Sequence, residues 1–166
     1  MKLLIAYGTK TGSAREMATL LADELARHDV TLVDLATECP NPAEFDYVVL
    51  GSAIRMNRPI RHVRRYVAKY EKALCNVPHT LFLCSAFPDQ FDHYLGVAFT
   101  RELIDTAEEC VYFGGDLALS RQRGVDKILT RMLRNSILEN EEEEGCVLPT
   151  LLPEHVRALA DRLRKK

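Results

Sequence analysis

A loop rich in hydroxyls and glycine lies between the first apolar run of the chain and its first amphipathic segment. Residues 2–7 (KLLIAY) predict a strand, residues 8–12 (GTKTG) a tight loop, and residues 13–25 a helix with apolar side chains at helical spacing. Ser13 is placed to cap this helix, with Glu16 reaching back in a capping box. A helix N-terminus with three hydroxyls and one lysine around it suits a phosphate monoester.

The spacing of this loop excludes other phosphate motifs. The dinucleotide fingerprint needs a glycine two residues after Gly8, and a nucleoside triphosphate loop needs Gly-Lys where Ser13 and Ala14 stand. A cysteine-dependent phosphatase would need a cysteine at the end of the first strand, and a response-regulator receiver would need acidic residues near that end, where Tyr7 and Gly8 stand. An ordinary strand-to-helix turn without a ligand is the remaining alternative, although the density of hydroxyls argues against it.

The length and composition predict one domain over residues 1–166. The chain is 47% hydrophobic, which allows a full core, and no apolar run approaches the roughly 20 residues that a membrane span needs. No leader pattern is evident, so we expect a cytoplasmic protein. The five cysteines are odd in number and contain no Cys-x-x-Cys pair, so we interpret them as core residues and expect neither a disulfide framework nor a metal site.

The charges are distributed unevenly, although the net charge is only −2. Residues 55–72 carry seven basic side chains against one acid, residues 121–134 carry five against one, and residues 139–144 are almost all glutamate. Such blocks are commonly solvated helix faces or loops. The alternative is a basic rim that faces an anionic substrate, a partner or a membrane surface. We expect no nucleic-acid partner.

Short apolar runs alternate with amphipathic segments after the first helix, which predicts a parallel sheet covered on both faces. We therefore expect an α/β fold, a doubly wound five-stranded parallel sheet of order 2-1-3-4-5. The ligand crevice of such a sheet lies at the carboxyl ends of its first and third strands. The further strands are expected at 30–35, 47–50, 80–84 and 110–114, and crossover helices at 60–74 and 93–106, the latter with Val97, Phe99, Leu103 and Ile104 inward.

The sequence after the fifth strand is longer than this fold needs. Pro153 starts a closing helix, and residues 118–146 are predicted to be an insertion that contains a basic amphipathic helix and an acidic link. The basic helix, within residues 121–138, can pack on the sheet, lie on a membrane surface or meet a partner.

The loops after the third and fourth strands are candidates for holding the ring of a flavin. Small residues and backbone amides from Ser52 to Met56 permit close approach to the polar edge of an isoalloxazine. Phe87 or Phe91, which follow Ser85 and Ala86, can stack on such a ring, although either aromatic alone is commonly a packing residue.

Three segments of the chain resemble a known family. They are YGTKTGSARE from Tyr7, GSAIR from Gly51 with the helix that ends in RYV, and FGGDL from Phe113 leading to DKI. On these segments, residues 1 to about 138 resemble the flavodoxin superfamily and, within it, the menaquinone-dependent protoporphyrinogen oxidases. The first segment is typical of FMN-binding flavodoxin folds, and the other two point to the oxidase subgroup.

This resemblance implies an FMN-dependent oxidoreductase that passes electrons from a tetrapyrrole to a quinone at the membrane. Arg55 is expected to stabilise the reduced flavin anion or an anionic substrate, because a fixed positive charge stabilises developing negative charge. No catalytic acid or base is identified. The implied cofactor contacts are Thr9, Lys10, Thr11, Gly12, Ser13, Ala14, Ser52, Ala53, Ile54, Arg55, Met56, Ser85, Ala86, Phe87 and Phe91.

Two other functions remain open at this point. A flavodoxin-type electron carrier would dock to redox proteins and need no small substrate, and a binding module would have kept the fold without the flavin. The expected electron partner is accordingly a quinone or a redox protein. We also expect peripheral contact with the inner face of the membrane through residues 121–138.

Overall fold

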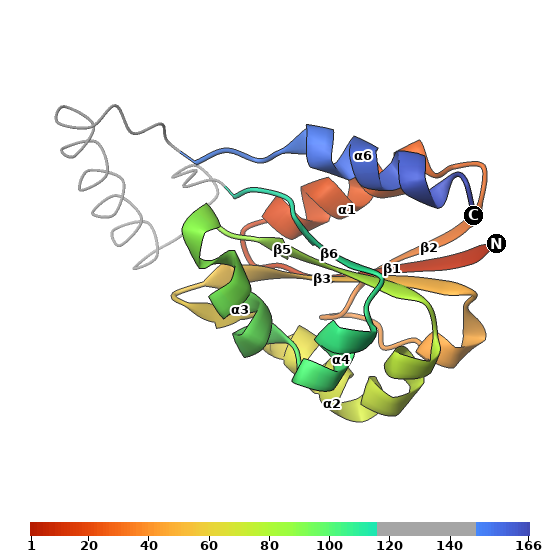
Figure 1. The fold of residues 1–166 in the computed structure, drawn as a ribbon, viewed down its shortest axis with the longest axis horizontal. Helices are drawn as coiled ribbons and strands as arrows, with labels where there is room; N and C mark the ends of the chain where they lie inside the picture. The colour runs from red at the N-terminus through yellow and green to blue at the C-terminus, as the bar shows by residue number, and fades with distance from the viewer. Residues whose placement is uncertain (116–148) are drawn as a thin grey trace, which may run out of the picture.

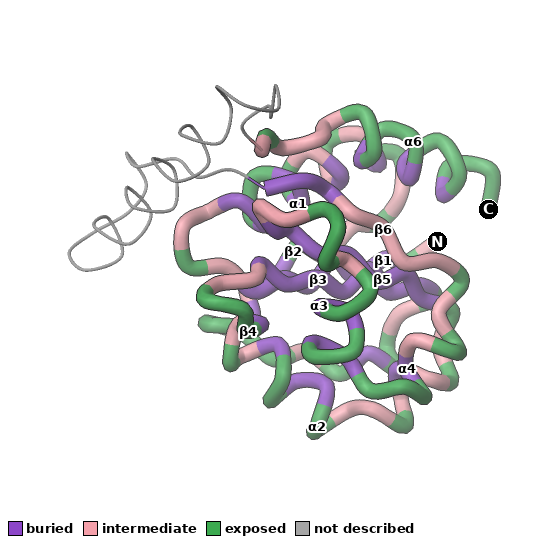
Figure 2. The backbone as a smooth tube through the Cα atoms, turned by 60° about the vertical axis from the view of Figure 1, so that its left-hand side comes forward, coloured by how far each residue is buried: buried purple, intermediate pink, exposed green. Residues whose placement is uncertain are grey.

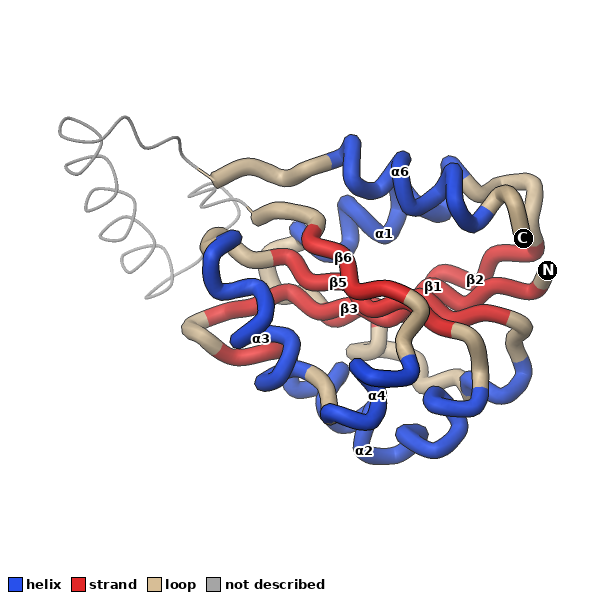
Figure 3. The backbone as a smooth tube through the Cα atoms, in the orientation of Figure 1, coloured by secondary structure: helices blue, strands red, loops and turns tan. Residues whose placement is uncertain are grey.

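The computed structural model describes residues 1–115 and 149–166, which form three layers. A parallel sheet lies between α1 (Ser13–Glu24) and α6 (Pro153–Leu163) on one side and α2, α3 and α4 on the other (Figure 1, Figure 3). The strand order is β2-β1-β3-β5-β6, with the short β4 paired to β3 alone. Because β4 lies off the parallel path, this order is the predicted 2-1-3-4-5, and the doubly wound fold is confirmed.

The parallel strands end together at one edge of the sheet. They are β1 (Lys2–Gly8), β2 (Asp29–Asp34), β3 (Tyr47–Arg55), β5 (His79–Cys84) and β6 (Glu109–Tyr112). Tyr7 in β1 lies opposite Asp34 in β2 and Gly51 in β3, and Ser52 in β3 lies opposite Leu83 in β5. The loops that follow β1, β3 and β5 therefore start side by side.

The third strand is longer than the apolar run predicts. Residues 51–53 continue it because they stay buried and pair with β5, and residues 51 and 52 also pair with β1. The chain then turns at Met56 and Asn57, which have φ of 49° and 58°, and returns as β4 (Arg58–Pro59). Positive φ at both central residues is what a two-residue type I′ hairpin turn requires. The β3–β4 hairpin is absent from the sequence prediction.

Two predictions about helices are wrong. Gly12, not Ser13, occupies the N-cap of α1, and its carbonyl accepts the Glu16 amide at 2.9 Å, so helical geometry begins at Ser13 itself. The single helix expected over 93–106 is two helices, α3 (Phe91–Ala98) and α4 (Arg101–Thr106). An extended residue and a Thr100 side chain that accepts the Leu103 amide separate them. This break leaves Val97, expected inward, 40% exposed.

The other predicted helices are present with small shifts of their ends. The segment 60–74 forms α2 (Arg61–Asn76), and Pro153 begins α6, in which Val156, Leu159, Ala160 and Leu163 are buried. Short 3₁₀ turns at Pro42–Glu44 and Pro88–Gln90 complete the described elements.

The sheet separates two hydrophobic cores. Leu3 and Ile5 of β1 face α1 and α6, while Leu4 and Ala6 face α2 to α4, because alternate side chains of a strand point to opposite faces. The central strands β1, β3 and β5 are buried along most of their length, the edge strands β2 and β6 are only partly buried, and the helices are exposed on their outer sides (Figure 2). Gly51 admits no side chain, because a Cβ there would lie 2.1 Å from the ring of Phe82.

Two backbone segments far apart in sequence close the sheet edge. Gly114 and Leu151 form an antiparallel bridge, the Gly115 amide donates to the Thr150 carbonyl at 3.1 Å, and the Leu152 amide donates to the Phe113 carbonyl at 3.0 Å. From this junction α6 runs back and packs on α1. The predicted insertion over 118–146, with its basic helix, lies outside the described residues.

Candidate functional site

The loop between β1 and α1 is built around a glycine in the left-handed region. Gly12 has φ of 100°, and a Cβ at this position would meet nothing within 4 Å. Glycine is therefore required for conformation rather than for space. The Gly12 amide donates to Thr9 Oγ1 at 2.9 Å, which closes the loop on itself and leaves the Thr9 hydroxyl proton able to donate outward.

The first turn of α1 faces this loop. The amides of Ala14 and Arg15 belong to the turn in which helical geometry supplies no acceptor. Ser13 and Ala14 are buried, Thr9 and Thr11 are half-buried, and the Lys10 side chain is exposed. The six predicted phosphate contacts thus form one continuous segment at the carboxyl edge of β1, with the positive end of the α1 dipole behind it.

Arg15 holds α1 to the sheet, an interaction that the sequence interpretation missed. Its guanidinium donates to Asp34 at 3.0 Å from Nη2 and to the Tyr7 hydroxyl at 3.3 Å from Nε. The hydrogen bond to Asp34 is the main cause that raises the Arg15 pKa, followed by the bond to Tyr7. Because Arg15 is paired with Asp34, the basic side chain that the loop offers to an anion is that of Lys10.

The β3–β4 hairpin is held at its base by Ser52. The buried Ser52 hydroxyl donates to the Ala53 carbonyl at 2.9 Å and accepts the Ile60 amide at 3.1 Å. Because both hydrogen bonds of the Ser52 hydroxyl are made within the hairpin, a ligand at this strand end would contact backbone groups. Along the hairpin, Ile54 and Arg55 are half-buried and Met56 is 63% exposed.

The loop after β5 is fixed at Ser85. Its amide donates to the Gly114 carbonyl at 2.9 Å, its hydroxyl accepts the Phe87 amide at 3.2 Å, and its carbonyl accepts the Tyr112 hydroxyl at 2.5 Å. Burial raises the pKa of Tyr112 to about 12, so the phenol stays a donor at neutral pH. A Cβ on Gly115 would lie 2.3 Å from the Ser85 carbonyl oxygen, so the sheet edge packs directly on this loop.

A hydrogen bond joins the hairpin turn to α3, the helix that follows the second predicted ring loop. The Tyr94 hydroxyl of α3, whose residue is fully buried, donates to Asn57 Oδ1 in the hairpin turn at 2.8 Å. Phe87 and Phe91 are half-buried, and the Phe91 ring meets Tyr112 edge-on with centroids 5.7 Å apart. Tyr94, Asn57 and Tyr112 carried no signal in the sequence, because their partners are 27 to 37 residues away.

The family assignment follows from the sequence as a whole. A family model described as a flavodoxin domain matches residues 4–144. The chain belongs to the flavodoxin domain family. Protoporphyrinogen IX dehydrogenase [quinone] of Escherichia coli strain K12 is 26% identical to this flavodoxin domain, over 80% of the chain and 78% of that protein. The recognition made from the three motifs is confirmed.

Solved structures share the fold of this flavodoxin domain. The Fusobacterium nucleatum flavodoxin bound to flavin mononucleotide superposes with a TM-score of 0.54 and 13% identity, over 99% of this chain and 98% of that one. The two-electron reduced Megasphaera elsdenii flavodoxin also gives a TM-score of 0.54, with 17% identity over 66% of this chain and 84% of that one.

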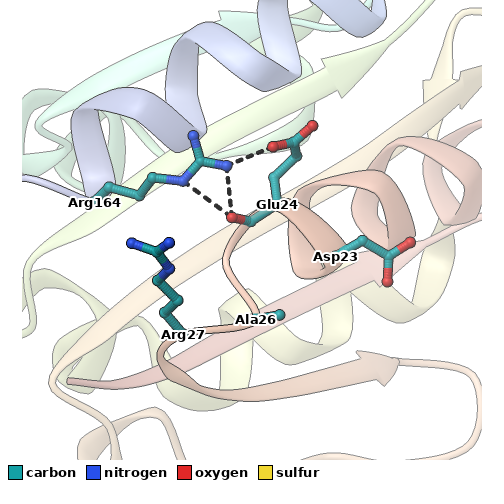
Figure 4. A pocket seen from close by; sticks show the side chains of 5 residues that line it. All are labelled: Asp23, Glu24, Ala26, Arg27 and Arg164. Carbon is teal, nitrogen blue, oxygen red and sulfur yellow. Dashed lines mark hydrogen bonds and ion pairs between the residues drawn. The ribbon is translucent and has the colours of Figure 1, made fainter.

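Two surface cavities of the flavodoxin domain lie along α1. One of about 530 Å³ starts at the phosphate loop, where Thr11 and Gly12 line it, and continues past Thr19 to Asp23. The other, of about 330 Å³, lies at the far end of the helix (Figure 4). There, the Arg164 guanidinium binds the Glu24 carbonyl through Nε at 3.1 Å and Nη2 at 2.7 Å, so this second cavity belongs to a helix terminus that the protein itself caps.

Proposed function

We propose that this flavodoxin domain binds FMN and acts as an oxidoreductase. The observation that carries the proposal is the left-handed Gly12 at the N-terminus of α1, at the carboxyl edge where β1 and β3 lie side by side. This conformation, with the first-turn amides and the hydroxyls of Thr9 and Thr11, fits a phosphate dianion. Membership of the flavodoxin domain family adds independent support.

The residues that would hold the cofactor divide into two groups. Residues 9–14 would bind the phosphate, while the hairpin at 52–56 and the loop at 85–91 would enclose the ring. When bound, FMN would supply reversible transfer of electrons or hydride. The chain would hold the hairpin backbone through Ser52, fix the second loop through Ser85, and place the Arg55 charge near the ring.

We further propose that electrons pass from an anionic tetrapyrrole to a quinone. The support is the similarity to the Escherichia coli relative, whose name specifies protoporphyrinogen IX and a quinone. A flavodoxin-type electron carrier that docks to a redox protein is the second candidate, favoured by the flavodoxins among the solved structures of the same fold. A module without flavin is the third.

The first experiment is the visible absorption spectrum of the purified protein before and after FMN is added and the excess removed. A bound flavin spectrum supports the first two candidates, and a colourless protein that retains no FMN refutes both. Turnover of protoporphyrinogen with a quinone and no protein partner then distinguishes the enzyme from the carrier, since a pure carrier gives no turnover.

Three further expectations stay predictions. Residues 1–166 form one domain with an insertion over 118–146, the protein is cytoplasmic, and residues 121–138 contact the inner face of the membrane. Within the described residues, no helix has the length and apolar character needed to cross a bilayer.

A further inference from the structure

A row of basic side chains covers the outer face of α2. Six exposed residues form this basic stripe, namely Arg58, Arg61, Arg64, Arg65, Lys69 and Lys72. Counted from Arg61, the other four residues of α2 lie three, four, eight and eleven positions along the helix, which places the five on one broad face. From Arg61 to Lys72 the stripe runs about 17 Å along the helix axis, at a rise of about 1.5 Å per residue.

The positive charge of the basic stripe is not neutralised by the protein around it. Among residues 1–115 and 149–166, no carboxylate lies within ion-pairing distance of its six cations, whereas seven other ion pairs are formed there. Lys69 contacts the Cys39 sulfur at 3.9 Å and lies over the Tyr70 ring, neither of which removes its charge. Residues three or four positions apart on a helix have Cβ atoms about 5–6 Å apart, less than the Debye length of about 8 Å, so the fields of neighbouring cations add.

The acidic side chains of the neighbouring elements do not cancel the stripe. Glu71 lies on the flank of α2 and is half-buried. The 3₁₀ turn that packs on α2 contributes the exposed Glu44, and α4 contributes Glu102 and Asp105, of which Asp105 pairs with Arg101 of its own helix. The face therefore presents six cations in one row, a charge distribution that attracts anions.

The shape and composition of this face favour a lipid surface over a protein. Specific protein interfaces depend on buried aromatic or large apolar anchors at their centre, and from Arg61 to Lys72 the only exposed residue without a charge is Ala68. The helix forms the outer layer of the molecule on this side (Figure 1), so its cations can reach a flat surface together. At one end of the row, next to Arg58, the hairpin turn carries the exposed Met56, the kind of side chain that enters a bilayer interface.

We propose that α2 rests on an anionic lipid bilayer, with the basic stripe against lipid phosphates and Met56 at the headgroup level. This orientation brings the hairpin, and with it the carboxyl edge of the sheet, to the membrane. The attachment does not require the flavin. If the proposed function is correct, the bilayer is the surface from which the protein would reach a quinone. The attachment to lipid does not depend on that function.

The test is sedimentation of the full-length protein with vesicles of phosphatidylcholine containing about 30% phosphatidylglycerol. The wild type is expected to bind these vesicles and to be released from them at about 0.5 M salt. It is expected not to bind vesicles of pure phosphatidylcholine. The triple variant R61Q/R65Q/K72Q, which removes three of the six cations of the stripe, should bind about 100-fold more weakly, at about 1 kcal/mol per cation lost. Glutamine keeps helix propensity, so α2 is retained.

The matched control is R27Q/R157Q/K165Q, which removes the same charge from exposed positions on the α1 and α6 side. It should bind within about twofold of the wild type. An equal loss in both triples, unchanged binding of the stripe variant, or no binding of the wild type overturns the proposal. Stripe-dependent binding of an acidic ferredoxin in place of vesicles would also overturn it, in favour of a protein partner. The absorbance of bound FMN, recorded for each variant, shows independently whether the protein binds the flavin. Vesicle binding and FMN binding are therefore tested separately.

Discussion

Gly12→Ala tests the feature on which the phosphate site depends. The backbone at Gly12 has φ of 100°, and the added methyl group would meet nothing within 4 Å. The cost of the substitution is therefore conformational strain alone, about 1–2 kcal/mol for an L-residue in the left-handed region. In a chain of this length, that loss lowers the midpoint of thermal unfolding by about 2–8 °C.

The same strain sets the expected loss of flavin affinity. If the alanine relaxes the loop in the free protein, the free protein escapes part of the strain and FMN must restore the left-handed conformation. The losses of stability and of affinity then share about 1–2 kcal/mol, so the Kd rises by up to about 30-fold. Urea unfolding followed by circular dichroism measures the first effect. Titration of FMN fluorescence measures the second.

Gly96→Ala is the matched control for this prediction. Gly96 is an exposed residue of α3 with ordinary φ, and a Cβ there also meets nothing within 4 Å. Alanine at this helical position should stabilise the protein by up to about 1 kcal/mol and leave the Kd for FMN unchanged. If both alanine variants have equal stability, the reasoning on backbone strain is refuted. If Gly12→Ala loses little stability, so that its loop has relaxed, but binds FMN as the wild type does, the phosphate assignment is refuted.

Three further predictions concern groups that hold the fold together. Tyr66→Phe should raise the free energy of unfolding by about 1 kcal/mol, because the buried Tyr66 hydroxyl has no hydrogen-bond partner among the described residues, whereas Tyr94→Phe should lower it by a similar amount. Arg164→Gln should lower it by about 1–2 kcal/mol in urea unfolding, because the last carbonyl of α1 loses its donors. The hydrogen bond from Lys166 lowers the pKa of Glu108 below 4.5, the ordinary pKa of a glutamate side chain. The stability lost in Glu108→Gln should therefore be constant above pH 4.5. It should vanish as the pH falls further and the carboxylate of the wild type is protonated.

Each of these predictions has a contrary outcome. Equal effects of the two phenylalanine substitutions would mean that the two hydroxyls have the same environment. Arg164→Gln should be compared with Lys165→Gln at the exposed neighbouring position, and equal stabilities would show that the cap contributes nothing. A stability difference for Glu108→Gln that persists unchanged at pH 3 would contradict the assigned ion pair.

The fold could be predicted because its determinants are local. Apolar runs such as Leu3–Ala6 mark strands that are buried on both faces, and parallel strands with crossover helices allow few strand orders. The β3–β4 hairpin was missed because Arg58 and Pro59 resemble a polar loop, and its stability comes from pairing with β3. The break between α3 and α4 carried a local signal, the capping residue Thr100, but the continuous apolar periodicity of the segment concealed it.

The candidate site could be predicted only in its position. The order of strands indicates that the loops after β1, β3 and β5 meet at one edge, and they do. The contacts that fix them, such as Arg15 with Asp34 and Tyr94 with Asn57, join residues on different elements. Their pairing depends on the packing of the whole chain, which no spacing within one segment reveals.

The hydrogen-bonded junction at Gly115 and Thr150 allows the connection between these two residues to vary in length at little cost to the fold. These two points are already joined by backbone hydrogen bonds, so the sheet edge and α6 do not depend on the length of the connection between them. Doubling the length of such a connection adds only about 0.6 kcal/mol of closure entropy. A longer or shorter connection between these two points would therefore change the stability of the rest of the domain only slightly. Gly115 packs on the Ser85 backbone, so this connection begins beside the candidate site. A change in it can therefore alter which molecules the site binds without altering the fold.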